Sequence, residues 1–136
     1  MGCDVVTVSP DTQFVHLAWQ ADEKALADAN FSMGADPTGF LHRMFNVLIE
    51  EEGLGERGTF IIDPDGIVAN IEVNHPDIGR NIDELMRKFK ANLYLSKKTT
   101  EGCPSKWKEE GDVTLKPSEK MVGKVHEALA NEGNPA

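Results

Sequence analysis

The sequence predicts an α/β layered domain with a partly parallel sheet. Segments with β-strand composition alternate with segments of helical periodicity along the first part of the 136-residue chain. The second part holds a β-hairpin followed by a long amphipathic helix. The expected order is strand, helix, strand, helix, hairpin, helix and an irregular tail.

The first elements are a strand and a helix. Asp4–Ser9 has the composition of a strand. Ser9 is the predicted N-cap of the next helix, with Pro10 at its first position and Asp11 as the alternative cap. Residues 22–29 continue or restart this helix. Its apolar face is expected to consist of Phe14, Leu17, Ala18 and Trp19.

A second strand and helix follow. Phe31–Asp36 is a short strand candidate, and the next residues, Asp36–Gly39, have turn composition. A short helix is predicted over Phe40–Leu48, with an apolar side. We interpret the carboxylate run Glu50–Glu52 as part of a solvated loop over residues 50–56, because a charge run is usually exposed. The expected apolar side of the helix is Leu41, Met44, Phe45 and Leu48.

Residues 58–73 predict a β-hairpin. Thr59–Ile62 is β-branched and aromatic, which suits a largely buried strand. In the tight turn Asp63–Gly66, proline presets φ and glycine accepts a positive φ. The second strand is Ile67–Val73, and alternation gives it one face that we expect to be buried. That face is Ile67, Ala69, Ile71 and Val73.

The strongest helical pattern runs from Ile82 to about Leu95, with Asn81 as its predicted cap. Pairs at i, i+4 spacing are expected on its polar side. Beyond Ser96 the periodicity is lost, apart from a weak helix over Met121–Leu129 and a frayed end over 131–136. The predicted pairs are Asp83–Arg87 and Glu84–Lys88, and the apolar stripe is Ile82, Leu85, Met86, Phe89 and Leu93.

The composition excludes several classes of function. A net charge of −9 argues against binding to nucleic acid, which needs clustered basic residues. No apolar run approaches the roughly 20 residues that span a bilayer. Asp4 interrupts the first residues, so they do not form a signal peptide. We therefore expect a cytoplasmic protein with no membrane contact, whose cysteines are reduced.

Cofactor and metal motifs have poor sequence context. Gly53–Gly58 matches G-x-G-x-x-G, but it follows a predicted helix and enters a strand, the reverse of a dinucleotide site. The four histidines are scattered and form no H-E-x-x-H motif. We therefore expect neither a bound cofactor nor a metal.

The two cysteines differ in their surroundings. Cys103 lies in a Gly-Cys-Pro segment beyond the last strong helix, where we expect a mobile, exposed thiol. Such a thiol can take part in disulfide exchange or be idle, and the residues alone favour neither. Cys3 begins an apolar strand and is expected to be a small buried hydrophobe. Arg57, just before the hairpin, is by itself typical of a surface or salt-bridge residue.

Six stretches of the chain form a recognisable set, in order and with characteristic spacing from residue 1 to about residue 125. They are Asp4–Ser9, Asp11-Thr12-x-Phe14-x-His16-x-x-Trp19, Asp36–Gly39, Glu52–Leu54, Arg57-x-Thr59-Phe60-x-x-Asp63-Pro64-x-Gly66 and Cys103-Pro104-x-Lys106-Trp107. Taken together, these motifs resemble the typical two-cysteine peroxiredoxins, in particular their bacterial alkyl hydroperoxide reductase group.

The resemblance implies a thioredoxin-like fold and a thiol-dependent peroxidase that reduces alkyl hydroperoxides or hydrogen peroxide. Residues 1–95 match the C-terminal part of the domain, and residues 96–136 match an arm that carries the resolving cysteine, Cys103. Arg57 matches the arginine beside the reactive thiolate. Ile67–Val73 matches the edge strand of a homodimer, and such dimers can build rings. Electrons would come from a flavoprotein or a thioredoxin-like reductase, with no bound cofactor.

One family feature has no match. The peroxidatic cysteine lies in a Pro-x-x-x-Thr-x-x-Cys loop before the strand at Val5, and Cys3 does not replace it. The fold is therefore expected to be truncated at its N-terminus, which would expose a sheet edge and an apolar face. We expect a complementary N-terminal polypeptide, self-association or an interrupted reading frame. The alternative function is a non-catalytic remnant or dimerisation module.

Overall fold

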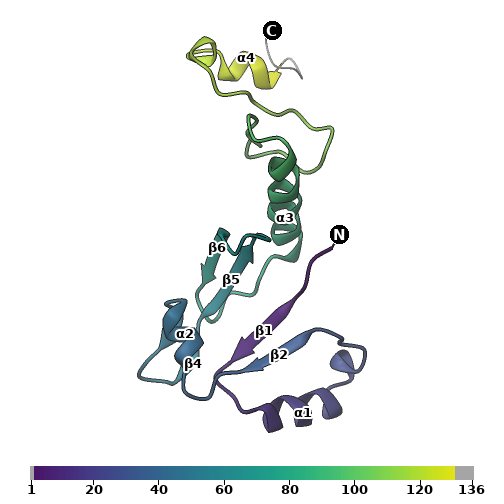
Figure 1. Cartoon of the computed structure of the whole chain (residues 1–136), viewed down its shortest axis with the longest axis vertical. Helices are drawn as coiled ribbons and strands as arrows, with labels where there is room; N and C mark the ends of the chain where they lie inside the picture. The colour runs from purple at the N-terminus through teal and green to yellow at the C-terminus, as the bar shows by residue number, and fades with distance from the viewer. Residues whose placement is uncertain (1, 131–136) are drawn as a thin grey trace. The chain divides into compact units, whose positions relative to one another are not determined.

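A computed structural model describes residues 2–130 of the chain (Figure 1). The chain forms two compact units, Met1–Thr59 with Ile71–Gly79, and Phe60–Asn70 with Arg80–Ala136. We call them unit 1 and unit 2. The elements are β1 (Val6–Ser9), α1 (Gln13–Asp22), η1 (Lys24–Leu26), β2 (Ser32–Ala35), α2 (Phe40–Met44), β3 (Leu48–Ile49), β4 (Leu54–Gly55), β5 (Arg57–Ile62), β6 (Val68–Asn74), α3 (Ile82–Lys97), η2 (Glu119–Met121) and α4 (Val125–Ala130).

Unit 1 begins with a strand–helix–strand motif. β1 and β2 are parallel, in a register that pairs Val6 with Ser32 and Ser9 with Ala35. α1 connects the two strands and lies along β2 (Figure 1). The predicted strand, helix and parallel pairing are confirmed.

The start of α1 differs from the prediction. Thr12, and neither Ser9 nor Asp11, occupies the N-cap position. Ser9 is the last residue of β1, and its hydroxyl donates to Asp11 Oδ2 at 2.7 Å and lies 2.6 Å from Nε2 of His16. Its side chain therefore joins the strand to the helix instead of capping it. The segment 22–29 restarts as η1, which Glu23 caps by accepting from the Ala25 amide.

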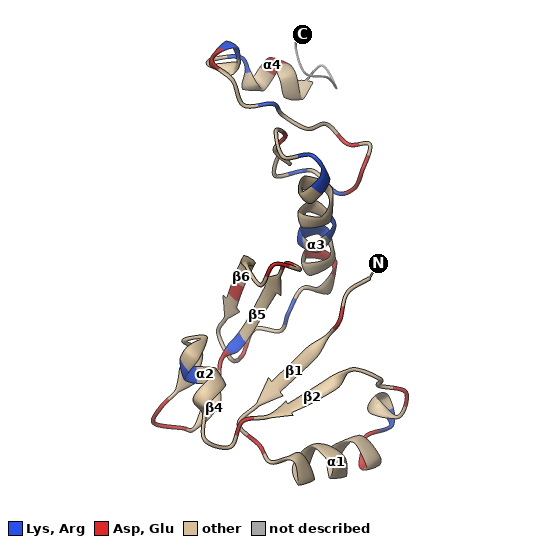
Figure 2. Ribbon diagram, in the orientation of Figure 1, with Lys and Arg blue, Asp and Glu red and all other residues tan. Residues whose placement is uncertain are grey.

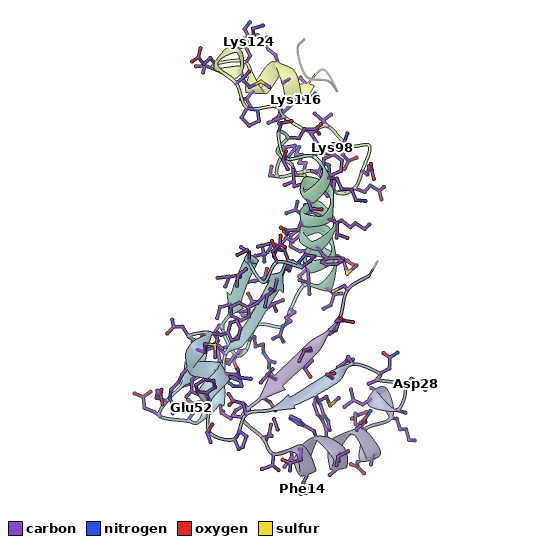
Figure 3. The ribbon with its side chains drawn as sticks, viewed as in Figure 1. Phe14, Asp28, Glu52, Lys98, Lys116 and Lys124 are labelled. Atoms are coloured by element: carbon purple, nitrogen blue, oxygen red, sulfur yellow. The ribbon has the colours of Figure 1, made fainter. Side chains whose placement is uncertain are left out.

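The predicted apolar face of α1 is exposed. Phe14 is 71% exposed and projects away from β1 and β2 (Figure 3). Leu17 and Trp19 are also exposed, and the one buried residue of α1 is His16. The expectation that these apolar residues point inward was wrong, because the side of α1 that meets β1 is the side that carries His16.

α2 is shorter than predicted. Asn46 adopts a φ of 55°, which ends the helical path before Val47, the buried residue that follows. β3 and β4 then form a small antiparallel hairpin that the sequence did not predict. Its turn carries the carboxylates Glu50–Glu52, which are exposed as expected. The Gly53–Gly58 segment contains β4 and enters β5, so it does not open a helix as the turn of a dinucleotide site would.

β5 and β6 form the predicted hairpin. Asp63 Oδ1 accepts from the amides of Asp65 and Ile67, and Gly66 has a φ of 82°. The predicted burial of β6 was wrong. Ile67, just before the strand, and Ile71 within it are each 63% exposed, whereas the polar residues Asn70 and Glu72 are half-buried. The apolar residues of this strand are therefore exposed instead of buried.

α3 is the longest helix of unit 2. Asn81 is its N-cap, as predicted, and its side chain accepts from the Glu84 amide at 3.1 Å. Its acidic residues lie in the first turn, and its basic residues follow farther along the helix (Figure 2). The predicted pair Glu84–Lys88 is present at 3.9 Å, but Arg87 pairs with Glu84 instead of Asp83. The apolar stripe is half-buried except at Ile82 and Leu93, which are exposed.

The rest of unit 2 is largely irregular, as expected. Its buried residues are Trp107, Met121 and Ala128. The weak helix predicted over Met121–Leu129 is divided between η2 and α4, because Gly123 between them has a φ of 75°. Residues 131–136 lie outside the described part of the chain. Among the described residues, no helix has both the length and the apolar character needed to cross a membrane.

Candidate functional site

Arg57 is the first residue of β5 and lies in unit 1. It is exposed, and its Nε donates to the carbonyl oxygen of Pro76. The approach to Arg57 is fixed by the backbone, since the Glu56 amide donates to the Val47 carbonyl at 2.8 Å. The guanidinium is thus attached to an ordered strand end.

A buried polar pair lies in the same unit. Asp36 and His42 are 4% and 6% exposed, and Asp36 Oδ2 accepts from Nδ1 of His42 at 2.8 Å and from its backbone amide at 3.0 Å. Burial by itself raises the pKa of Asp36, but the hydrogen bonds from His42 and Leu41 outweigh it and lower that pKa. The sequence analysis missed this pair. The predicted turn Asp36–Gly39 includes the aspartate, but no sequence spacing rule pairs this aspartate with a histidine six residues later.

Cys103 lies in unit 2, beside a short antiparallel bridge. The amide of Gly102 donates to the carbonyl of Leu115 at 2.7 Å, and the Leu115 amide donates back at 2.9 Å. The Cys103 thiol is free and half-buried rather than exposed as predicted. Burial raises its pKa, the Arg87 guanidinium lowers it in part, and the Glu101 carboxylate raises it.

Arg87 links α3 to the Cys103 segment and was not among the predicted site residues. Its Nη1 donates to the Trp107 carbonyl at 3.1 Å. Its Nε and Nη2 bind the two carboxylate oxygens of Glu84 at 2.6 and 2.9 Å. This bidentate pair fixes the orientation of the guanidinium near the thiol. The helical spacing predicted an ion pair for Arg87, but not its contact with a residue 20 positions away.

Trp107 anchors the segment that follows Cys103. Its side chain is 1% exposed, and its ring centroid lies 5.6 Å from that of Tyr94 on α3. The Tyr94 hydroxyl donates to Glu101 Oε2 at 2.6 Å, and the Thr114 hydroxyl donates to the same oxygen at 2.7 Å. These contacts hold the residues on both sides of Cys103 against α3.

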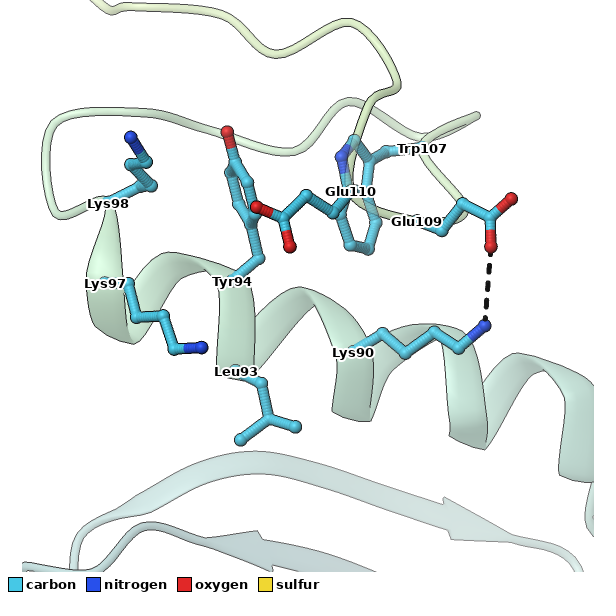
Figure 4. A pocket seen from close by; sticks show the side chains of 8 residues that line it. All are labelled: Lys90, Leu93, Tyr94, Lys97, Lys98, Trp107, Glu109 and Glu110. Carbon is cyan, nitrogen blue, oxygen red and sulfur yellow. Dashed lines mark ion pairs between the residues drawn. The ribbon is translucent and has the colours of Figure 1, made fainter. Parts of the chain in front are cut away.

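A shallow pocket adjoins this cluster (Figure 4). Lys90 and Glu109 form an ion pair of 3.8 Å at its rim. Two lysines at the end of α3, the aromatic rings of Tyr94 and Trp107, and the side chains of Leu93 and Glu110 complete the lining (Figure 4). Both signs of charge are present, so the lining does not select one class of ion.

Cys3 does not behave as predicted. It is exposed, and its thiol donates to the carbonyl of Asp4 at 3.3 Å. The expectation of a small buried residue was wrong, because Cys3 lies before β1, and both Val5 and the first strand residue Val6 are themselves exposed. Within residues 2–130, no group of three or more His, Cys, Asp or Glu side chains is arranged to hold a metal ion.

The sequence is similar to those of known bacterial proteins. Over 125 residues it is 46% identical to alkyl hydroperoxide reductase C of Salmonella typhimurium and 48% identical to that of Amphibacillus xylanus. In both cases 92% of this chain is covered. The chain spans 66% of the length of these curated relatives.

Solved structures give the same relationship. The crystal structure of Enterococcus faecalis AhpC aligns with a TM-score of 0.71 at 38% identity, covering 75% of this chain and 61% of that one. The reduced 2-Cys peroxiredoxin of Plasmodium vivax aligns with a TM-score of 0.79 at 31% identity, covering 86% and 61%. The predicted thioredoxin-like peroxiredoxin fold is confirmed. Residues 1–71 match the AhpC/TSA family, and the chain belongs to that peroxiredoxin family.

Proposed function

We propose that this chain supplies the resolving thiol and a peroxide-site arginine to a thiol-dependent peroxidase of alkyl hydroperoxides or hydrogen peroxide. The strongest support is that Cys103 of this peroxiredoxin chain has the accessibility and surroundings that a resolving thiol needs. It is a free, partly accessible thiol beside an arginine, and it begins the motif Cys103-Pro104-x-Lys106-Trp107. Residues 96–136 would act as the arm that presents this thiol to a partner.

The proposed reaction uses a cysteine on a second polypeptide. Its thiolate attacks a peroxide oxygen, the O–O bond breaks, and an alkoxide or hydroxide leaves and takes up a proton from the solvent, which leaves the cysteine oxidised to a sulfenic acid. The Cys103 thiolate then attacks the sulfenic sulfur, forming an S–S bond and releasing hydroxide, which takes up a proton. A flavoprotein or a thioredoxin-like reductase returns two electrons and two protons to restore both thiols.

Arg57 would act on the first step. A guanidinium remains charged at any physiological pH and offers several donors in a fixed plane. Placed beside the partner's cysteine, it would favour the thiolate and orient the peroxide. Its single described hydrogen bond, from Nε to the Pro76 carbonyl, leaves the outer edge of the guanidinium in position for such contacts.

The direct test is a complementation assay. The purified chain alone should reduce no peroxide, and adding an N-terminal polypeptide with a Pro-x-x-x-Thr-x-x-Cys segment should restore turnover. Cys103→Ser should abolish the intersubunit disulfide, whereas Cys3→Ser, the matched control, should leave turnover unchanged. Turnover by the chain alone that disappears in Cys3→Ser would contradict the proposal.

A second candidate is a non-catalytic dimerisation module. Ile67, just before β6, and Ile71 within it are each 63% exposed, which favours association through the Ile67–Val73 region. Native mass spectrometry should then show a dimer, or a ring of dimers, which Ile71→Lys dissociates. If Cys103 is also no more reactive than a free cysteine analogue, this candidate replaces the first. In either case we propose the cytoplasm as the compartment.

A further inference from the structure

We propose that Asp36 and His42 are positioning residues for Arg57, and that the His42 imidazole, oriented by Asp36, sets the path of the chain into β5. The inference rests on the role proposed above for Arg57. All of the residues involved belong to unit 1, so their contacts lie within one compact unit.

The first step is the way the imidazole is held. One oxygen of Asp36 accepts both from the ring, at 2.8 Å, and from the backbone amide of the same histidine, at 3.0 Å. Both side chains are more than nine-tenths buried. A buried carboxylate with two bonds to one residue fixes the rotamer of that residue, because breaking either bond leaves a buried group unsatisfied.

The second step is the contact between the ring and β4. A Cβ atom built on Gly55 would lie 2.5 Å from Cδ2 and 2.6 Å from Nε2 of His42. The imidazole therefore rests directly on the Gly55 backbone. Any side chain at this position would force either the ring or the strand to move, so the spacing between α2 and β4 is set by the ring.

The third step connects the same histidine to Arg57 through the backbone. The Val47 amide donates to the His42 carbonyl at 2.8 Å, and the Val47 carbonyl accepts from the Glu56 amide at 2.8 Å. Glu56 immediately precedes Arg57. His42 thus touches the chain on both sides of the short hairpin, at Val47 and at Gly55, just before the arginine.

The test measures the order of the arginine itself in the isolated full chain. In ¹⁵N relaxation experiments, the Arg57 Nε–H should be ordered in the wild type through its bond to Pro76. His42→Ala should increase its mobility several-fold. His42→Asn should have a smaller effect, because the amide nitrogen can replace Nδ1 as donor to Asp36. The matched control is Arg43→Gln, the next residue along α2, whose guanidinium pairs with Glu50. It should change nothing at Arg57.

Two outcomes would overturn the inference. One is an unchanged Arg57 Nε–H in both His42 variants. The other is a His42→Ala effect that appears equally in the amides of β1 and β2, since that would indicate only a general loss of stability.

A second experiment, on the complemented peroxidase, distinguishes a failure of this inference from a failure of the proposed function. In the complemented peroxidase, His42→Ala should raise the KM for peroxide more than it lowers kcat, and Arg57→Lys should abolish turnover. If the complemented wild type has no turnover, the proposed function fails, and the relaxation measurement still decides the role of His42. If Arg57→Lys is inactive but His42→Ala is fully active with an unchanged KM, the function stands and the inference fails.

Discussion

Arg57 and Cys103 are held in different ways. Arg57 is placed by the backbone, through the hairpin β3–β4 and the bond from its Nε to the Pro76 carbonyl. Cys103 is surrounded by charged side chains, with Arg87 and Glu101 acting on its thiol in opposite directions. A residue that is always charged needs only the correct position, whereas a thiol also needs its proton affinity adjusted.

The largest expected effect is on stability, and it distinguishes the buried Trp107, which anchors the segment after Cys103, from an exposed tryptophan. Trp107→Ala should lower the free energy of unfolding by about 3–5 kcal/mol, because it removes a fully buried indole and leaves a cavity beside Tyr94. Trp19→Ala is the control, since Trp19 is 55% exposed, and it should stay within about 0.5 kcal/mol of the wild type. Urea denaturation measures both. Equal losses of unfolding free energy in the two variants would contradict the role of Trp107 as the anchor of the segment after Cys103.

The next effect tests the close packing on the approach to Arg57. Gly55→Ala should cost about 1–3 kcal/mol, because the new methyl group meets the His42 ring at 2.5 Å. Gly79→Ala is the matched control in the same unit, since a Cβ there meets nothing within 4 Å. Thermal unfolding followed by circular dichroism compares the two. If Gly55→Ala is as stable as Gly79→Ala, the contact between the ring and β4 is not tight.

Local signals predicted much of the fold. The turn at Asp63–Gly66 and the Asn81 cap each depend on a few adjacent residues, and both were correct. Burial was predicted poorly. Phe14 and Ile71 satisfy the periodicity of an inward face and yet are exposed, because periodicity identifies an apolar face but not the element that covers it.

Some residues of the candidate site were predicted and others were not, because sequence patterns do not show which distant residues come into contact. Cys103 and Arg57 were found through motifs that are read along the chain. The pair Asp36–His42 and the bond from Arg87 to the Trp107 carbonyl join residues that only the folded chain brings together. No composition or spacing rule could have selected them.

A third prediction concerns the acid sensitivity of unit 1. Hydrogen bonds lower the pKa of Asp36 in the folded chain despite its burial, so its ionised form stabilises the fold at pH values above the ordinary carboxyl pKa of about 3.9. This contribution should be lost as the pH falls through the lowered folded pKa. Asp36→Asn should therefore be less stable at pH 7 and show a shallower loss on acidification. Unfolding midpoints between about pH 7 and pH 3 measure the slope.

The control for this slope is Asp28→Asn, at an exposed position of the same unit (Figure 3). Its stability should follow that of the wild type over the whole pH range. A wild-type slope that remains in Asp36→Asn would show that other carboxylates account for the acid sensitivity.

The smallest expected effect concerns charge at Cys103. Glu101→Gln keeps an oxygen that can accept from Tyr94 and Thr114, but it removes the negative charge that raises the pKa of the Cys103 thiol. The pKa should fall, so the thiolate fraction near neutral pH should rise, and alkylation by iodoacetamide should become about twofold faster. The measurement uses a Cys3→Ser background so that only Cys103 reacts.

Salt separates the electrostatic cause from a structural one. Added salt screens charges near the surface, so the difference between Glu101→Gln and its parent should shrink at about 1 M ionic strength. An increase that persists at high salt would mean that the substitution had opened the segment around Cys103. In that case access, and not proton affinity, controls the thiol, and Cys103 would be governed by position in the same way as Arg57.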